Sequence, residues 1–252
     1  MTTFREWAST LPPGAGRVRV TPGDIAEIIL DDPRTRNALS PRMMVELADA
    51  VDAVAAARVV LLRGDHGTFC SGGNLADVRA HLARPGVGRQ MGTFMQATLH
   101  RLATSDAVVV GVLDGAAMGG GAELLAACDR VFAAPSARVG WVQARLAVSP
   151  GFGGGARLVA RVGAARALEH LLGGPVPASE AGALVDALSV DPLAAARAWA
   201  EEVARLDPAA ARGAVRIVRA ARAIDPRVAE VELEVFDALW GAPAHLAALD
   251  RR

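Results

Sequence analysis

Glu123 is the residue of this sequence that is best placed for acid–base chemistry. It follows three consecutive glycines, Gly119 to Gly121, which in turn follow the uncharged, β-branched run 108–113. That run predicts a strand buried on both faces, and residues 122–128 predict a helix directly after the glycines. Backbone N–H groups at a helix start have no partner within the helix, and the helix dipole adds partial positive charge there. A ligand oxygen could therefore approach these N–H groups closely, with one carboxylic acid nearby.

Another Gly-rich turn, the first along the chain, has the same relation to a buried strand. The strand predicted at residues 59–63 ends in the turn 64–75, which contains CSGGNL at residues 70–75. Two backbone N–H groups from separate loops that point at one place form an oxyanion hole for a developing negative oxygen. One glycine cluster alone would indicate only a tight turn, whereas two clusters after two apolar runs favour such a hole.

The composition is that of a globular protein with no strongly charged partner. The chain of 252 residues is 52% hydrophobic, and 27 basic and 27 acidic residues give a formal net charge of zero. No basic run indicates nucleic acid or a membrane surface, no apolar segment reaches the ~18–20 residues of a spanning helix, and residues 1–14 do not resemble a signal peptide. Cys70 and Cys128 lack metal or disulfide spacing and are expected to be buried thiols in a reducing compartment. We therefore expect a cytoplasmic protein without a metal site.

Hydrophobic periodicity predicts an α/β sheet core followed by helices alone. Strands are expected at residues 17–20, 25–30, 59–63, 108–113, 130–133 and 139–142. Helices are expected from Pro41, with Ser40 as the N-cap, over 78–103 with a break near Pro85 and Gly86, and at 122–128, 156–172, 179–188, 193–206, 208–224 and 228–240. This order predicts an α/β core at residues 1–190 and a helical C-terminal region at residues 191–252.

Four segments resemble motifs of the crotonase superfamily, the enoyl-CoA hydratases and isomerases. Residues 32–39, DPRTRNAL, resemble the segment after the first strand of that family, and residues 69–75, FCSGGNL, resemble F-x-A/S-G-x-D-L. Residues 114–129, DGAAMGGGAELLAACD, resemble the specific signature N-G-x-A-x-G-G-G-x-E-L-x-x-x-C-D. Residues 150–158, PGFGGGARL, resemble P-G-x-G-G-T-x-R-L, so the resemblance covers nearly the whole chain.

The resemblance implies a fold, a substrate class and an oxyanion hole. The fold would be a crotonase-like spiral of ββα units, with a helical C-terminal trimerisation region that builds a homotrimer or homohexamer. The substrate would be an acyl-CoA, whose thioester oxygen accepts hydrogen bonds from the N–H groups of Gly73 and Gly120. Coenzyme A is part of that substrate, so no separate cofactor is expected.

One departure from the resemblance changes the expected chemistry. The two catalytic glutamates of the family's hydratases fall on Glu123 and on Gln143. An amide is neither an acid nor a base near neutral pH, so water addition by two carboxylates is not expected. A 2-carboxyacyl-CoA brings its own carboxylate, which a second ionised glutamate would repel and a neutral glutamine could hold. Loss of carbon dioxide then needs the hole, a desolvating pocket and a later proton, which Glu123 could supply.

Two further segments resemble one branch of the superfamily, the ethylmalonyl-CoA decarboxylases. Residues 240–249, WGAPAHLAAL, resemble the C-terminal W-G-G-P-A-N-L-x-A of that branch, and residues 140–159 resemble its F-V-x-x-x-M-G-x-x-P-x-W-G-G-x-x-R-L-V. Further candidates for substrate contact are Ser71 and Asn74 in the first Gly-rich turn, Trp141 and Phe152 for the acyl pocket, and His66, Arg34 and Arg36 for the phosphates of coenzyme A. Each of these has an ordinary alternative as a core aromatic, a solvated arginine or a structural histidine.

Three functions stay open at this point. The first is decarboxylation of a short 2-carboxyacyl-CoA such as ethylmalonyl-CoA or methylmalonyl-CoA. The second is an enoyl-CoA hydratase or isomerase that uses Glu123 alone, and the third is a non-catalytic protein that binds acyl-CoA. A dinucleotide site at the glycines is excluded, because Leu124 stands where the third glycine of G-x-G-x-x-G would be.

Overall fold

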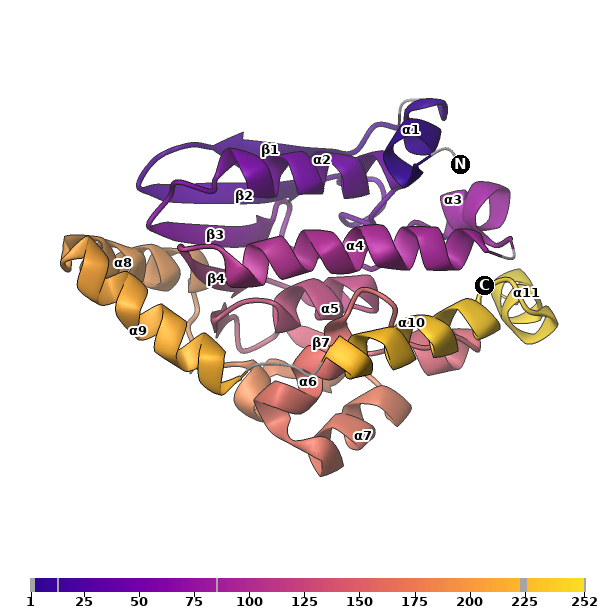
Figure 1. Ribbon diagram of the computed structural model, residues 1–252. Helices are drawn as coiled ribbons and strands as arrows, with labels where there is room; N and C mark the ends of the chain where they lie inside the picture. The colour runs from indigo at the N-terminus through magenta and orange to yellow at the C-terminus, as the bar shows by residue number, and fades with distance from the viewer. Residues whose placement is uncertain (1–2, 13, 85, 223–225, 252) are drawn as a thin grey trace.

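A six-stranded sheet forms the centre of the fold (Figure 1). The structure is a computed structural model, which describes residues 3–12, 14–84, 86–222 and 226–251. The strand order is β1 (Arg17–Thr21), β2 (Ile25–Asp31), β3 (Val59–Gly64), β4 (Val108–Leu113), β6 (Arg130–Ala133) and β9 (Ala187–Leu188). Only the β1–β2 pair of this sheet is antiparallel. A smaller sheet contains β5 (Ala116–Met118), β7 (Arg138–Gly140) and β8 (Val176–Pro177).

Helices cover both faces of the large sheet because its buried strands have apolar residues on both sides. In β3, Val60 and Leu62 belong to the larger core, which also contains residues of α2 (Pro41–Ala53), α4 (Val87–Thr104) and α5 (Gly120–Ala126). Their neighbours Val59 and Leu61 pack in a second core with Ala196 and Ala200 of α8 (Pro192–Arg205). This alternation is the period of two that a strand imposes on its side chains.

The remaining helices lie near the ends of the chain and around the glycine turns. They are α1 (Phe4–Ser9), α3 (Leu75–Asp77), the π-helix η1 (Val78–Leu82), α6 (Gly154–Val162), α7 (Ala164–Leu172), α9 (Pro208–Ala221), α10 (Pro226–Leu239) and α11 (Pro243–Asp250), with the 3-10 turns η2 (Gln143–Leu146), η3 (Ala178–Glu180) and η4 (Gly182–Leu184). No helix in the described part of the chain is long and apolar enough to cross a membrane.

A buried ion pair joins α8 to the sheet. Glu27 of β2 is 7% exposed and accepts hydrogen bonds from Arg63 at 2.8 Å and from Arg197 at 2.9 Å. These two guanidinium groups lower the pKa of Glu27, although its burial acts in the opposite direction. Helix α8 therefore belongs to the packing of the sheet.

The predicted strands and most of the predicted helices are confirmed. Ser40 caps α2 by accepting a hydrogen bond from the N–H of Met43 at 3.1 Å, and Pro41 is the first helical residue. The predicted break within residues 78–103 separates η1 from α4, and position 85 itself lies outside the described residues, as does the end of the helix predicted to reach 224.

Two predicted helices are wrong, and some elements were missed. The helix predicted over residues 156–172 is divided into α6 and α7 by Gly163, whose φ of 77° is left-handed. Residues 179–188 form two short 3-10 turns and then β9, which pairs with β6, so tertiary pairing outweighs local helical preference there. Elements α1, α11, β5 and β8 are too short to give a clear periodic signal.

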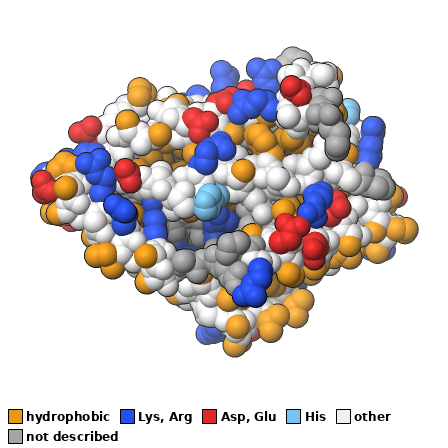
Figure 2. All heavy atoms as spheres, in the orientation of Figure 1, with side chains coloured by type: hydrophobic (Ala, Val, Ile, Leu, Met, Phe, Trp, Pro, Cys, Tyr) orange, Lys and Arg blue, Asp and Glu red, His pale blue; other side chains and the backbone are white. Residues whose placement is uncertain are grey.

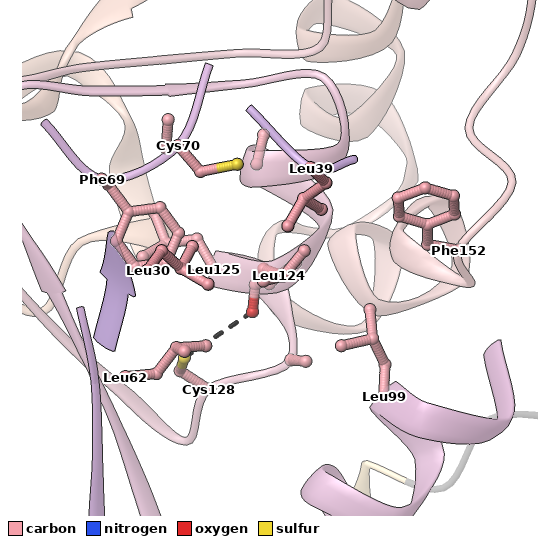
Figure 3. Packing of buried hydrophobic residues seen from close by; sticks show 14 of the residues in the cluster. Leu30, Leu39, Leu62, Phe69, Cys70, Leu99, Leu124, Leu125, Cys128 and Phe152 are labelled. Carbon is pink, nitrogen blue, oxygen red and sulfur yellow. Dashed lines mark hydrogen bonds between the residues drawn. The ribbon is translucent and has the colours of Figure 1, made fainter. Parts of the chain in front are cut away.

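Helix α5 is the most deeply buried helix near the site. All seven of its residues are buried, and Figure 3 shows Leu124 and Leu125 among side chains from several strands and loops, including Leu30, Leu62 and Phe69. Cys70 and Cys128 are free buried thiols, as expected from the sequence, and burial raises the pKa of each to about 12.

The C-terminal helices present apolar side chains to solvent instead. Helix α9 has no buried residue, and its Ile217 is 73% exposed. Leu168 and Leu172 of α7 are also exposed, and Figure 2 shows hydrophobic side chains along the lower edge of the molecule, where α7 lies in Figure 1. Exposed apolar helix faces of this kind are typical of surfaces that contact another protein chain.

Candidate active site

One mostly apolar cavity brings both glycine turns together. Gly73 of the first turn and Gly120 of the second both line it, and Glu123 lies in its wall. About 640 Å³ of space in and above this hollow is not filled by protein atoms, a volume that includes solvent at its open side. Its remaining walls come from η1, α4, the segment 142–152 and the C-terminal residues 236–249.

Backbone hydrogen bonds hold the two turns side by side. The N–H of Cys70 donates to the carbonyl of Ala116 at 2.9 Å, and the N–H of Met118 donates to the carbonyl of Cys70 at 2.9 Å. On its other side the first turn pairs with Leu39, whose N–H donates to Gly72 and whose carbonyl accepts from Asn74. The first turn is thus fixed on both sides, so the direction of its free N–H groups is also fixed.

Gly73 and Gly120 each keep a backbone N–H that has no acceptor among the described residues. A Cβ atom built on the neighbouring Gly72 would lie 3.7 Å from the nitrogen of Gly120, which shows how closely the turns approach each other. The same atom on Gly121 would lie 2.4 Å from the carbonyl oxygen of Cys70. Only glycine permits this approach, and it leaves two free donors at one cavity.

Asn37 fixes the start of the first turn, and the sequence analysis did not single it out. Its side chain is fully buried, its Nδ2 donates to the carbonyls of Asp65 and Thr68 at 2.9 Å, and its Oδ1 accepts from the N–H of Asp32 at 2.8 Å. Its φ of 58° is left-handed, a conformation that asparagine tolerates better than most residues. Asn37 could have been identified from the sequence by its position in the segment DPRTRNAL, which resembles a motif of the superfamily.

Glu123 is 2% exposed, and backbone N–H groups from the segment before α6 surround its carboxyl group. Oε2 accepts from Phe152 at 2.8 Å and from Gly154 at 3.0 Å, and Oε1 accepts from Gly151 at 3.4 Å. A Cβ atom on Gly154 would lie 2.4 Å from Cγ of Glu123, so this contact also requires glycine. The glycines of residues 151–155 therefore bring α6 against the acid.

Burial raises the pKa of Glu123 to about 8, and the nearby charge of Glu232 acts in the same direction. The three backbone N–H groups favour the ionised form and only partly offset these two effects. Glu232 is on α10 and accepts from the N–H of Ala156 at 3.1 Å, so both carboxyl groups lie at the start of α6. An acid with this pKa holds its proton at neutral pH.

Gln143 contacts Glu123 directly. Its Nε2 donates to Oε1 of Glu123 at 2.9 Å, its side chain lines the cavity, and its Oε1 is buried without a hydrogen-bond partner among the described residues. A buried amide oxygen without a donor is costly, so a bound ligand or a different partner is expected to satisfy it. Glu123 is the only carboxylic acid among the described residues that line the cavity.

The C-terminal segment closes the cavity with Phe236, Trp240 and His245. The indole N–H of Trp240 donates to the carbonyl of Leu82 at 2.7 Å, which joins the segment to η1. His245 is 1% exposed, and the sequence analysis did not place it at the site. No periodic pattern in the sequence links residue 245 to Glu123, so only tertiary packing places His245 at the site.

The other predicted contact residues divide into two groups. Phe152 lines the cavity, and Ser71 lines both the cavity and an adjoining groove, whose wall also includes Asn74 and Arg36. The structure does not bring Trp141, His66 or Arg34 to either hollow. Trp141 is a core residue whose ring packs against His170 at an interplanar angle of 54°, with ring centroids 5.9 Å apart.

The groove also contains an arginine that the sequence analysis did not name. Arg145 of η2 and Arg36 both line this groove, so two arginines border the space beside the cavity. Planar guanidinium groups suit phosphate oxygens. Arg145 lies only two positions after Gln143 in the sequence, and this proximity was the available signal.

His66 takes part in the one cluster of the described chain with the spacing of metal ligands. Ligand atoms of His66, Asp31 and Asp65 lie within 4.8 Å of one another. Arg19 forms ion pairs with both aspartates, and His66 Nε2 lies 3.0 Å from Asp31. The two carboxylates already have cationic partners, so this cluster is explained as an ion-pair network.

Comparison with known proteins assigns the chain to a family. The family profile described as enoyl-CoA hydratase/isomerase matches residues 21–240. A Gallus gallus protein named ethylmalonyl-CoA decarboxylase is 33% identical over 240 residues, covering 90% of this chain and 80% of that protein. Its Danio rerio counterpart is 32% identical and covers 98% and 86%. An enoyl-CoA hydratase/isomerase crystal structure from Mycobacterium paratuberculosis shares the fold at a TM-score of 0.85 and 20% identity, covering 95% of this chain and 99% of that one. The chain belongs to the enoyl-CoA hydratase/isomerase family, the crotonase superfamily.

Proposed function

We propose that this enzyme decarboxylates a short 2-carboxyacyl-CoA, of the ethylmalonyl-CoA or methylmalonyl-CoA type. The thioester oxygen would accept hydrogen bonds from the N–H groups of Gly73 and Gly120. The bond between Cα and the carboxylate breaks, its electron pair forms the enolate, and carbon dioxide leaves. The two N–H groups stabilise the negative oxygen of the enolate more than the carbonyl of the bound substrate, which lowers the barrier.

The observation that carries this proposal is the pairing of Glu123 with Gln143 in a cavity that has no other acid among its described lining residues. Water addition by two carboxylates has no second carboxylate here. The described residues of the lining also include no arginine, so they offer only neutral donors to a substrate carboxylate. Neutral donors hold the carboxylate without the strong ion pair that its loss as carbon dioxide would have to break.

Glu123 is the proposed source of the proton that completes the reaction. With a pKa near 8, it carries a proton at neutral pH and can donate it to Cα of the enolate. In the protonated form, the O–H of Glu123 needs an acceptor, and the unpartnered Oε1 of Gln143 serves if the amide turns over. The same turn directs Nε2 of Gln143 toward the substrate, and after proton transfer the amide returns to the ionised Glu123.

The test is a panel of three thioesters incubated with the enzyme and analysed by mass spectrometry. We expect ethylmalonyl-CoA or methylmalonyl-CoA to lose 44 mass units, the mass of carbon dioxide, and crotonyl-CoA to remain unchanged. A gain of one water by crotonyl-CoA at ordinary enzymatic rates would overturn the proposal. Curated relatives named ethylmalonyl-CoA decarboxylase support the choice of panel.

A hydratase or isomerase that uses Glu123 alone is the second candidate. It is favoured by the same single acid, because one carboxyl group can remove and return a proton when a double bond moves. It predicts product from crotonyl-CoA or a 3-enoyl-CoA and no carbon dioxide. A non-catalytic acyl-CoA-binding protein would bind all three thioesters and leave each unchanged.

The wider assembly forms part of the proposal. Arg36 and Arg145 in the groove would contact the phosphates of coenzyme A, since the groove adjoins the cavity through Ser71 and Val142. The exposed apolar faces of α7, α9 and α10 would form the contacts of a homotrimer or homohexamer in the cytoplasm. Sedimentation velocity would test the assembly, and a monomer at micromolar concentration would contradict it.

A further inference from the structure

His245 presents one defined hydrogen-bond donor to the cavity. Its Nδ1 accepts a hydrogen bond from the backbone N–H of Gly241 at 2.9 Å. A peptide N–H only donates, so Nδ1 carries no proton, and the proton of the neutral imidazole is on Nε2. Nε2 has no partner among the described residues, and the side chain lines the cavity.

The surroundings of His245 keep its imidazole neutral. Burial lowers its pKa, and the described residues contribute no carboxylate that forms an ion pair with it. The Trp240 ring lies against it, with centroids 4.7 Å apart, and fixes the plane of the imidazole. The donor is therefore oriented before any ligand enters.

Helix α11, which carries His245, lies beside the turn that contains Gln143. Helix α11 packs against η2, which begins at Gln143. Gly241 makes the turn before α11 with a φ of 72°, and a Cβ atom there would lie 3.2 Å from the carbonyl carbon of Ala83. The tight turn thus fixes the distance between α11 and the cavity.

We propose that Nε2–H of His245 binds the carboxylate of the substrate that leaves as carbon dioxide, and so selects carboxylated acyl-CoA thioesters. This inference rests on the proposed function and adds a specificity-determining residue to it. A neutral donor recognises the carboxylate by a hydrogen bond and does not hold it as an ion pair. Together with Nε2 of Gln143 it provides two donors for the two oxygens of one carboxylate.

The test uses two ligands that differ only in the carboxylate and undergo no reaction. S-(2-carboxyethyl)-CoA and S-propyl-CoA are thioethers, so neither can lose carbon dioxide through an enolate. Isothermal titration calorimetry gives the ratio of their dissociation constants for each protein. Inactive protein lowers the stoichiometry for both ligands equally, so the ratio reports on the folded fraction alone.

We expect the wild-type protein to bind the carboxylated thioether at least about tenfold more tightly than the propyl thioether. His245→Leu should reduce this ratio about tenfold, and His245→Asn, which keeps a donor, should retain most of it. His170→Leu is the matched control, because His170 is also buried with a lowered pKa but lies outside the cavity lining. Its ratio should equal that of the wild type.

An unchanged ratio in His245→Leu, or no preference for the carboxylate in the wild-type protein, would overturn the inference. Failure of the proposed function has a different signature, because it would show as no release of carbon dioxide while the binding ratio stays as expected. The two results are therefore measured independently.

Discussion

The two walls of the cavity are built on opposite principles. The loop wall, formed by Gly73 and by Gly120 to Glu123, offers backbone N–H groups, and at Gly121 it has no space for a Cβ atom because Cys70 lies against it. The C-terminal wall, from Phe236 to residue 249, offers side chains on helices that are partly exposed. We infer that the loop wall determines the reaction class, whereas the C-terminal wall determines which acyl group is accepted.

The largest expected effect comes from a methyl group in the loop wall. Gly121→Ala places a Cβ atom 2.4 Å from the carbonyl oxygen of Cys70, so the turns must separate and the N–H of the neighbouring Gly120 must move. We expect about a 1000-fold loss of kcat and a decrease of about 1–3 kcal/mol in the free energy of unfolding.

Gly213→Ala is the matched control for this substitution. A Cβ atom on Gly213 of the exposed helix α9 meets nothing within 4 Å. Alanine should therefore stabilise the protein by about 0.5–1 kcal/mol without loss of activity. Urea unfolding and initial rates measure both variants, and equal activity of the two alanine variants would refute the idea of an intolerant loop wall.

Replacing the acid should have the second largest effect. Glu123→Gln keeps the shape, and its one side-chain oxygen can still accept from the N–H groups of Phe152 and Gly154, but it removes the proton source, so kcat should fall about 100-fold or more. When the reaction is run in D₂O, mass spectrometry of the product measures deuterium incorporation at Cα. This measurement separates protonation of the enolate from the release of carbon dioxide. If carbon dioxide release were to continue at the wild-type rate with normal incorporation, Glu123 would not be the proton donor.

A second carboxylate at position 143 should weaken decarboxylation and introduce some hydratase activity. Gln143→Glu places an acid at hydrogen-bond distance from Glu123 and beside the proposed position of the substrate carboxylate. Repulsion should lower kcat/KM for the carboxylated substrate about tenfold or more, while hydration of crotonyl-CoA becomes detectable. The Gln143→Met variant, which has no charge, is the control, and its decarboxylation should exceed that of Gln143→Glu.

The smallest expected effect, per pH unit, is the dependence of stability on pH that Glu123 causes. Its pKa in the folded protein is about 8, above the 4.5 of an ordinary glutamate, so the folded state binds more protons between these values. The free energy of unfolding should therefore fall as pH rises from about 4.5 to 8, by at most about 1.4 kcal/mol per pH unit. Glu123→Gln should show a flatter dependence in urea titrations at pH 5 to 8, and an identical slope would contradict the raised pKa.

The glycine turns were predictable because each follows a continuous apolar strand, and strand, turn and acid are local in sequence. Helix ends near Ser40 and Pro41 were predictable for the same reason, since capping depends on neighbouring residues. The segment 179–188 was not predictable in this way. Its β9 exists only because β6 offers an edge for pairing, and no local pattern contains that information.

By itself, the sequence determined which chemical groups exist near the turns: free N–H donors, one acid at position 123 and an amide at position 143. Only the tertiary structure decided how these groups act. Burial and the distant Glu232 set the pKa of Glu123, and the packing of α11 against η2 brought His245 into the cavity. The reason is physical: hydrogen-bond capacity is a property of each residue, whereas desolvation, charge proximity and direction depend on which surfaces the folded chain brings together.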